Sequence, residues 1–497
     1  MLGDVRTSVP LAARTGLRPD RRIVAVLVAV TVAGGALRFA TLGVQSLWLD
    51  ESATVLLLRK SFTGMLGALP GSESAPPLYY CAAWLWARVF GLDAVGVRSL
   101  SALVGTLTIP VAYLAARSAS RAAGVCAAVL AAASPMLFYY AQEARPYALL
   151  ILLAALSFVC FVRAAGDERR GLRAWAAASA AALLTHYFAA FVILPEAAAL
   201  ARRRGLRACA PAFAAVGVVA VALLPLAVRQ RRDGKSNWIA DSPLLSRAAQ
   251  APKQFLVGID GPLEIVTALV SVLLVVLLLA RLRRARHAER ALAGRGAFVA
   301  VVAVGLPLLL SVSRVIDVFD GRNVVAAWMP AAVVPAVAAG VAGNRRAAAA
   351  LVAALAVLWT AVVAGVLLEP KLQRDDWRDV ARAVKAGGGG RFVVGPANAD
   401  VPLEVYLPGS RAVTARLLRA VEIDVVALPR RRTGRAPLAP ELPTAHLPGF
   451  RRAGTAGGSS YLVERFVAPR PTRVGRVALE TVAGDAAAAV VALPADR

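Results

Sequence analysis

Apolar runs separated by short clusters of arginine dominate the first three-quarters of the chain. A helix needs roughly 17–25 mostly apolar residues to cross the hydrocarbon core of a bilayer. Runs near that length predict about eleven membrane-spanning helices, and therefore an α-helical polytopic membrane protein. The predicted spans are residues 22–42, 98–116, 122–138, 147–163, 173–187, 188–201, 208–228, 262–281, 296–313, 323–342 and 346–368.

The arginine clusters predict the topology, because cytoplasmic loops of membrane proteins collect Lys and Arg. With residues 1–21 as a cytoplasmic tail, the basic clusters fall on the cytoplasmic side, provided that 76–89 does not span. That segment is short and rich in Trp and Tyr, which is typical of a helix lying in the membrane interface. The predicted outer regions are then 43–97, 139–146, 229–261 and 313–322.

Residues 369–497 change character and predict a small α/β domain, which an odd number of spans places on the extracytoplasmic side. An amphipathic helix is expected from Asp375, which is placed to cap it, up to the glycine run at 387–390. The last thirty or so residues are weakly patterned, and we expect them to be partly disordered. Apolar runs of β type occur at Arg391–Gly395, Ile423–Leu428 and Tyr461–Phe466.

The composition supports a membrane protein and excludes nucleic-acid binding. Of the 497 residues, 58% are hydrophobic, whereas soluble domains carry roughly 45–50% apolar residues. The formal net charge is +27, but the basic residues form short clusters and not the stripe with interleaved aromatics that a nucleic-acid groove needs. The four cysteines occur singly in apolar segments, without the spacing of metal ligands.

The strongest chemical signal is Trp48-Leu49-Asp50-Glu51 in the first outer loop. Two adjacent carboxylates follow the first span, at an interface where partial desolvation raises the basicity of an acid. Such a group can accept a proton from a hydroxyl nucleophile. The alternative is that Asp50 and Glu51 simply begin a helix, whose positive end favours acids.

The second signal is the short outer loop Gln142-Glu143-Ala144-Arg145-Pro146-Tyr147, on the same predicted face as Asp50. Arg145 has the planar group that holds a phosphate oxygen with two hydrogen bonds. The alternative is a local pair between Glu143 and Arg145 at a helix boundary.

Arginines on the outer side run against the usual charge bias and suggest an anionic ligand. Arg322 is the main candidate, with contact to lipid head groups or pairing with Asp320 as the alternative. Arg247 lies in an outer loop without a nearby motif, so we expect it to contribute less than Arg322 to binding of the lipid phosphate. Glu196 lies inside an apolar segment, and we interpret it as a pairing residue in preference to a catalytic one.

In their order along the chain, these motifs resemble the bacterial branch of the GT-C glycosyltransferases. This branch is related to protein O-mannosyltransferases, lipid A aminoarabinose transferases and lipopolysaccharide galacturonosyltransferases. The resemblance covers about residues 20–370, and the segment from Asp375 is similar to the outer-face domain of many bacterial members. The motifs are Trp48-Leu49-Asp50-Glu51, Pro76-Pro77-Leu78-Tyr79-Tyr80, Arg98 and Gln142-Glu143-Ala144-Arg145-Pro146-Tyr147.

The resemblance implies a GT-C transmembrane domain over 22–368 and an extracytoplasmic domain over 369–497 of a protein in the cell membrane. It implies transfer, with inversion, of a sugar from a polyprenyl-phosphate donor. Mannose or another hexose or pentose would be the sugar, and a glycan, lipid or protein would be the acceptor. A divalent metal, which some relatives bind near the acidic loop, has too few ligands in this sequence to be assigned.

The resemblance also implies roles for single residues. Asp50 would be the catalytic base, and Glu51 would assist it or position the substrate. Glu143 would line the substrate cavity, while Arg145 and Arg322 would hold the lipid phosphate.

At the outer end of the fifth predicted span, the loop is poor in Arg and Glu compared with the family. His186 and Tyr187 stand there and are candidate substrate contacts, although a lone histidine in such a place is more often structural.

Two other classes of protein remain open. A transporter or flippase of lipid-linked or small anionic substrates would use Glu196 and Arg322 along a pathway, but the inverted symmetry common in transporters is not evident. A non-catalytic envelope scaffold would not require Asp50, Glu143 and Arg145 on one face.

Overall fold

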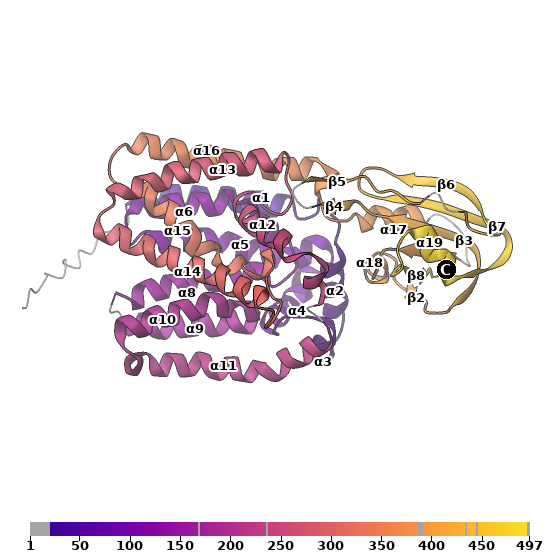
Figure 1. Cartoon of the computed structure of the whole chain (residues 1–497), viewed down its shortest axis with the longest axis horizontal. Helices are drawn as coiled ribbons and strands as arrows, with labels where there is room; N and C mark the ends of the chain where they lie inside the picture. Colours follow the sequence, from indigo (N-terminus) through magenta and orange to yellow (C-terminus); the bar gives the residue numbers. More distant parts are fainter. Residues whose placement is uncertain are drawn as a thin grey trace, which may run out of the picture.

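The molecule is elongated, with a bundle of helices at one end and a β-rich domain at the other (Figure 1). Most helices of the bundle run along its long axis, and the chain passes from α16 (Arg345–Leu368) into the β-rich domain. The computed structural model describes residues 20–166, 169–234, 237–385, 391–432, 435–443 and 446–494.

Helices occupy each apolar segment predicted to span the membrane, which confirms the α-helical polytopic class. In the described ranges, seven helices are long and apolar enough to cross a bilayer, and a bent pair makes an eighth candidate. These seven are α1 (Arg21–Ala40), α5 (Ala94–Ala116), α8 (Tyr147–Ala164), α11 (Leu206–Arg232), α13 (Glu264–Leu279) with η3 (Ala280–Arg284), α14 (His287–Val312) and α16.

Three further helices of the bundle are shorter than these candidates: α9 (Arg169–Thr185), α10 (Ala190–Arg204) and α15 (Trp328–Gly340). Counting them with the bent pair would give the predicted eleven, and that number stays a prediction.

The bent pair consists of α6 (Arg121–Ala133) and α7 (Pro135–Ala141), which meet at 56°. Pro135 lacks the N–H that would bond to the carbonyl of Ala131, and proline is tolerated at the first position of a new helix. The buried guanidinium of Arg38 in α1 donates to that same carbonyl at 3.0 Å. Arg38 therefore stabilises the break, which directs α7 and the loop after it toward the end of the bundle.

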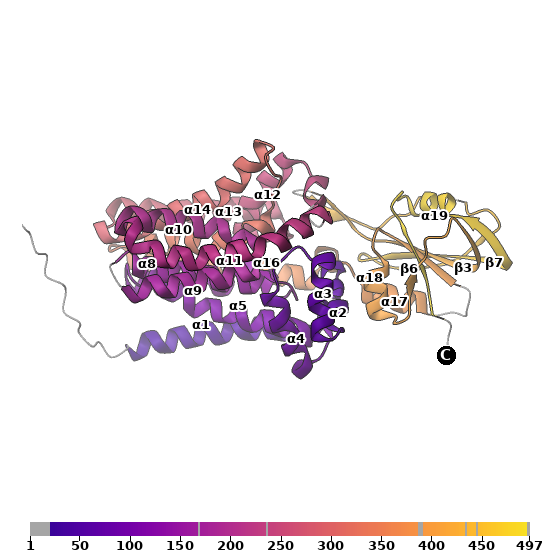
Figure 2. The same ribbon diagram turned by 90° about the horizontal axis from the view of Figure 1, so that it is seen from below.

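Three short helices cover the end of the bundle that faces the β-rich domain (Figures 1 and 2). They are α2 (Leu49–Leu58), α3 (Phe62–Ser72) and α4 (Leu78–Phe90). The 13 residues of α4 are too few to cross a bilayer. This agrees with the prediction of a short, non-spanning helix over 76–89. The other short elements are η1 (Tyr187–Ala189), η2 (Asn237–Asp241), α12 (Leu244–Val257), η4 (Gly321–Asn323), η5 (Val325–Ala327) and η6 (Pro370–Leu372).

The β-rich domain contains a six-stranded sheet in the order β2-β8-β1-β3-β7-β6. β1 and β3 are parallel, while the other neighbouring strands are antiparallel. A separate hairpin, β4 (Arg430–Arg432) and β5 (Arg435–Leu438), reaches back and contacts η6. The elements of the main domain are α17 (Trp377–Lys385), β1 (Arg391–Gly395), α18 (Asp400–Tyr406), β2 (Arg411–Ala412), β3 (Leu417–Ala427), β6 (Arg451–Gly457), β7 (Leu462–Gly475), α19 (Arg476–Ala483) and β8 (Ala489–Ala492).

Helices cover both faces of this sheet. Because side chains alternate along a strand, Val393 packs with Trp377 of α17 and Leu403 of α18, while Val394 packs with Leu479 of α19. The two faces explain why the central strand β1 is a continuous apolar run. The predicted small α/β domain is therefore present.

Two expectations for this domain were wrong. Asp376, and not Asp375, caps α17, because the helix begins one residue later than the pattern indicated, and the Asp376 carboxylate accepts the N–H of Asp379 at 3.3 Å. The last residues do form elements, α19 and β8, and β8 has only four residues, too few for a clear pattern. The glycine run at 387–390 lies outside the described residues.

Candidate functional site

The first turn of α2 presents Asp50 and Glu51 to different surroundings. Successive side chains on an α-helix point about 100° apart, since a turn takes 3.6 residues. Glu51 is fully buried, whereas the side chain of Asp50 is 25% exposed. The two adjacent carboxylates are therefore not interchangeable.

Glu51 forms a two-pronged ion pair with Arg98 of α5. The Nε and Nη2 atoms of Arg98 donate to the two carboxylate oxygens at 2.7 and 2.5 Å. Arg98 also donates to the backbone carbonyls of Leu42, Gln45 and Ser46, each at 2.8 Å. Burial raises the pKa of Glu51, but the charge and hydrogen bonds of Arg98 outweigh that effect and hold the pKa below its usual value. Glu51 is therefore ionised and engaged, and it fixes α2 against α5.

Asp50 faces a different arginine, and more loosely. Its Oδ2 accepts from Nη1 of Arg322 at 3.3 Å, and the side chain of Arg322 is 30% exposed. Arg322 lies in η4, and its Nε is 3.6 Å from the carboxylate of Asp320. The structure thus brings together Asp50 and Arg322, which are 272 positions apart in the sequence, at an accessible place.

Arg145 is directed toward the backbone and side chains around α2. Its Nη1 donates to Glu73 at 2.7 Å, to Thr54 at 3.2 Å and to the carbonyl of Asp50 at 3.4 Å. Glu73, which follows α3, is 2% exposed and has no counterpart among the sequence predictions. The local Glu143–Arg145 pair, considered as an alternative, does not occur among the described ion pairs, because Arg145 pairs with Glu73.

The loop that carries Glu143 is clamped from several sides. Glu51 accepts the N–H of Ala144 at 2.9 Å, and the side-chain amide of Gln142 donates to the carbonyl of Arg38. Glu143 is 2% exposed, and burial raises its pKa to about 7. A carboxyl group with a pKa near neutrality changes charge in the range where catalytic acids and bases operate.

Arg374, in the segment between α16 and α17, also holds this loop. It donates to the carbonyls of Gln142 at 2.6 Å and Tyr139 at 3.1 Å, and its guanidinium lies 4.3 Å from the centre of the Tyr139 ring. The charge of Arg374 lowers the pKa of Glu143 in part, against the larger effect of burial. Arg374 was not predicted from the sequence, although it directly precedes the Asp375-Asp376-Trp377 motif.

His186 and Tyr187 lie next to Tyr147 and α11. The His186 ring is 4% exposed, and its centre lies 5.6 Å from the centre of the Tyr147 ring. The hydroxyl of Tyr187 donates to Gln230 of α11 at 2.7 Å. Both contacts connect the turn before α10 to the neighbouring helices.

Two other acidic or basic candidates prove to be internal partners. Glu196 is fully buried and accepts from Ser157 and from Trp175, the latter at 2.8 Å, as expected for a pairing residue. Arg247, expected to matter little, is 6% exposed and bonds both oxygens of Asp317 at 2.8 and 2.7 Å. Arg247 therefore secures the loop before η4, and its smaller weight in lipid-phosphate binding relative to Arg322 stays a prediction. Across the described ranges, no group of three His, Cys, Asp or Glu side chains is placed to hold a metal ion.

Comparisons with known proteins agree with this architecture. Residues 74–228 match the family model for dolichyl-phosphate-mannose-protein mannosyltransferase. The crystal structure of ArnT from Cupriavidus metallidurans bound to undecaprenyl phosphate matches with a TM-score of 0.52 and 15% identity, over 90% of this chain and 98% of that one. The apo state of the same protein matches with a TM-score of 0.54 and 14% identity, over the same shares of each chain. No curated protein sequence matches.

Proposed function

From the GT-C fold that this chain shares with ArnT, we propose that it is a membrane glycosyltransferase that uses a polyprenyl-phosphate sugar as donor. The observation that carries the proposal is the loose pair of Asp50 and Arg322, a base and a phosphate ligand held 3.3 Å apart at an accessible site. The solved relative binds undecaprenyl phosphate, and the matching family is named for a dolichyl-phosphate sugar.

In the proposed reaction, an acceptor hydroxyl attacks the anomeric carbon of the donor sugar. The new glycosidic bond forms as the bond to the phosphate oxygen breaks, so the configuration inverts and the polyprenyl phosphate leaves with the electron pair. Asp50 takes the proton of the hydroxyl. Arg322 stabilises the leaving phosphate through charge-assisted hydrogen bonds. When Arg322 turns to the phosphate, the carboxylate of Asp50 is freed for the proton.

The other candidates position these two. Glu51 pairs with Arg98, and Arg145 pairs with Glu73. Together these pairs hold α2 and so fix the direction of Asp50. We propose that Arg145 does not bind the donor phosphate itself, since its guanidinium is already paired with Glu73, and that it contributes only by holding α2.

Three candidates border the site. We propose that Glu143, a buried carboxyl group with a raised pKa in the loop beside α2, lines the substrate cavity. His186 and Tyr187 support Tyr147 and the turn before α10 on the acceptor side.

The site and the C-terminal domain are proposed to face the extracytoplasmic side, and single cysteines can test this. In a background with the four native cysteines replaced, we expect Glu404→Cys to react with an impermeant maleimide added outside intact cells, and Arg207→Cys to react only after lysis. Both side chains are exposed. Labelling of Glu404→Cys only after lysis would reverse the proposed orientation.

The test of the function is sugar transfer by the purified Asp50→Asn variant. Mass spectrometry of lipids that copurify with the wild-type protein identifies the donor to be used. Losing a general base costs typically 10²–10⁴ in rate, so we expect transfer to fall by about that factor while the donor still copurifies. Glu404→Gln, which removes an exposed carboxylate in the β-rich domain, is the matched control and should keep full activity.

Activity of Asp50→Asn within about threefold of wild type would reject Asp50 as the base. The same assay distinguishes a glycosyltransferase from a transporter. A new glycosidic bond formed by protein in detergent, where no two compartments exist, requires an enzyme and cannot come from translocation.

A further inference from the structure

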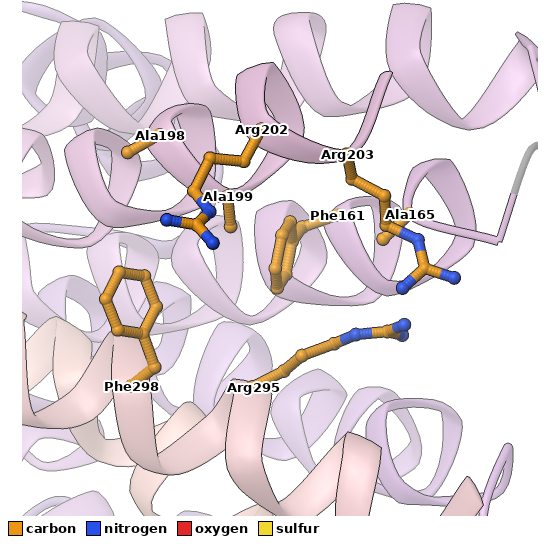
Figure 3. A pocket seen from close by; sticks show the side chains of 8 residues that line it. All are labelled: Phe161, Ala165, Ala198, Ala199, Arg202, Arg203, Arg295 and Phe298. Atoms are coloured by element: carbon orange, nitrogen blue, oxygen red, sulfur yellow. The ribbon is translucent and has the colours of Figure 1, made fainter. Parts of the chain in front are cut away.

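A second group of cations lies at the opposite end of the bundle from Asp50. α8 begins at Tyr147 beside the candidate site, and its 18 residues span about 27 Å at 1.5 Å per residue. Near its far end is a pocket of about 460 Å³ between α8, α10 and α14 (Figure 3). Its lining residues are Phe161, Ala165, Ala198, Ala199, Arg202, Arg203, Arg295 and Phe298.

The pocket combines an apolar surface with arginines from two helices. Figure 3 shows the guanidinium groups of Arg203 and Arg295 extending to the same side of Phe161, with Arg202 on its other side. Phe298 is 45% exposed on the outer surface of the bundle. The pocket is open to the side of the bundle, and its apolar surface suits an acyl chain. The arginines suit an anionic group.

In the part of the chain that the structure describes, these arginines have no protein partner, unlike Arg204 beside them. Arg204 donates to the carbonyl of Ala164 at 3.0 Å, so it completes the end of α8. Within the ranges that the structure describes, Arg202, Arg203 and Arg295 make no hydrogen bond or ion pair through their side chains, and no acidic residue lines the pocket. The guanidinium groups of Arg203 and Arg295 extend to the same side of the pocket (Figure 3), and a bound anion would relieve the repulsion between these like charges.

We propose that this pocket binds the phosphate head group of an anionic phospholipid, with an acyl chain along Phe298 and Phe161. Basic pockets between transmembrane helices are suited to anionic lipid head groups, and arginine holds phosphate oxygens in pairs. A phosphate here lies too far from Asp50 to deliver a sugar to it. The site is therefore separate from the proposed transfer reaction and does not depend on it.

The experiment uses the purified full-length chain in a neutral detergent. Binding of phosphatidylglycerol is measured by native mass spectrometry, with phosphatidylcholine and polyprenyl phosphate as the other probes. We expect phosphatidylglycerol to bind in preference to phosphatidylcholine. The double variant Arg203→Gln, Arg295→Gln should bind it at least about tenfold more weakly, because charge-assisted hydrogen bonds are lost.

Two further variants separate a built site from general attraction. Arg207→Gln makes the same change of charge per residue at an exposed position on α11 that does not line the pocket, and it should bind as wild type does. Ala199→Leu fills the pocket without changing charge and should weaken binding.

Equal loss in the Arg207→Gln variant and in the double variant would overturn the proposal in favour of unspecific attraction. Polyprenyl phosphate that displaces phosphatidylglycerol, and whose own binding depends on Arg295, would also overturn it, since the occupant would then be the carrier lipid. Unchanged binding in the double variant would have the same consequence.

Discussion

The two ion pairs on the first turn of α2 are made from adjacent carboxylates and yet differ in almost every physical respect. The Glu51–Arg98 pair is fully buried, has two short contacts and leaves its partners no freedom. The Asp50–Arg322 pair has one contact of 3.3 Å, and each side chain is a quarter to a third exposed. Buried pairs fix a conformation, whereas exposed pairs contribute little to stability.

This difference distinguishes the pair that holds the fold, Glu51–Arg98, from the pair that is free to react, Asp50–Arg322. A base must exchange its partner for a proton, and a phosphate ligand must exchange its partner for a substrate, so both need a weak resting contact. Asp50 and Arg322 meet that requirement, while Glu51 and Arg98 do not. The predictions below ask whether the two pairs can be told apart by experiment.

The largest expected effect is on stability, for Arg98→Met. Breaking a buried ion pair typically costs 3–5 kcal/mol, because the remaining charge is uncompensated. We expect the free energy of unfolding to fall by about that amount in detergent-induced unfolding. Adding Glu51→Gln to Arg98→Met should restore part of it, since no charge is then left unpaired.

Arg231→Met is the control for this prediction, because Arg231 is exposed at the end of α11. It should change the free energy of unfolding by at most about 0.5 kcal/mol. If Arg98→Met costs no more than this control, the buried pair does not stabilise the fold.

The next effect is a pH dependence of stability that Glu143 contributes. Its pKa is about 7 in the folded protein, above the value of about 4.3 expected in the unfolded chain. Between these values the unfolded state is ionised while the folded state is still protonated. The contribution of Glu143 is therefore fully present below about pH 4.3 and is lost as the pH rises to about 7.

Each pKa unit corresponds to about 1.4 kcal/mol, so this contribution amounts to about 4 kcal/mol in the wild-type protein. Unfolding measured across this range should show a shallower fall in Glu143→Gln than in wild type. Glu404→Gln, at an exposed position, should keep the wild-type slope. Parallel curves for Glu143→Gln and wild type would contradict the elevated pKa.

The smallest effect is on donor affinity, for Arg322→Gln. Loss of a hydrogen bond to a charged group costs about 1.5–3 kcal/mol, or roughly tenfold to a hundredfold in affinity. Polyprenyl phosphate binding to the purified variant, by isothermal titration, is the measurement. Arg231→Gln is the matched control, because Arg247 is buried and paired. Equal affinities for wild type and Arg322→Gln would exclude Arg322 as a phosphate ligand.

The parts of the molecule that could be predicted from the sequence are those that depend on short, continuous stretches of residues. Apolar runs located the helices of the bundle, and β1 was predicted with its observed bounds, Arg391–Gly395. The Trp48–Glu51 motif located the first turn of α2. The resemblance to the GT-C glycosyltransferases supplied the fold, which the structural match to ArnT bears out.

Partners that are distant in the sequence could not be predicted in this way. Glu51 and Asp50 look equivalent until Arg98 and Arg322 are placed beside them. Glu73 and Arg374 carry no local signal, because each matters only through the groups it meets after folding. The buried ion pair of Arg247 was not predicted for the same reason, since its partner Asp317 lies 70 positions away.

The position of β8 has a consequence for how the protein is made. This strand, residues 489–492, pairs on one side with β1 and on the other with β2, so the sheet stays divided until the last part of the chain arrives. During synthesis, the earlier strands would wait with two unpaired edges, and such edges readily pair with other chains. The sheet of this domain can thus be completed only after residue 492 has been synthesised.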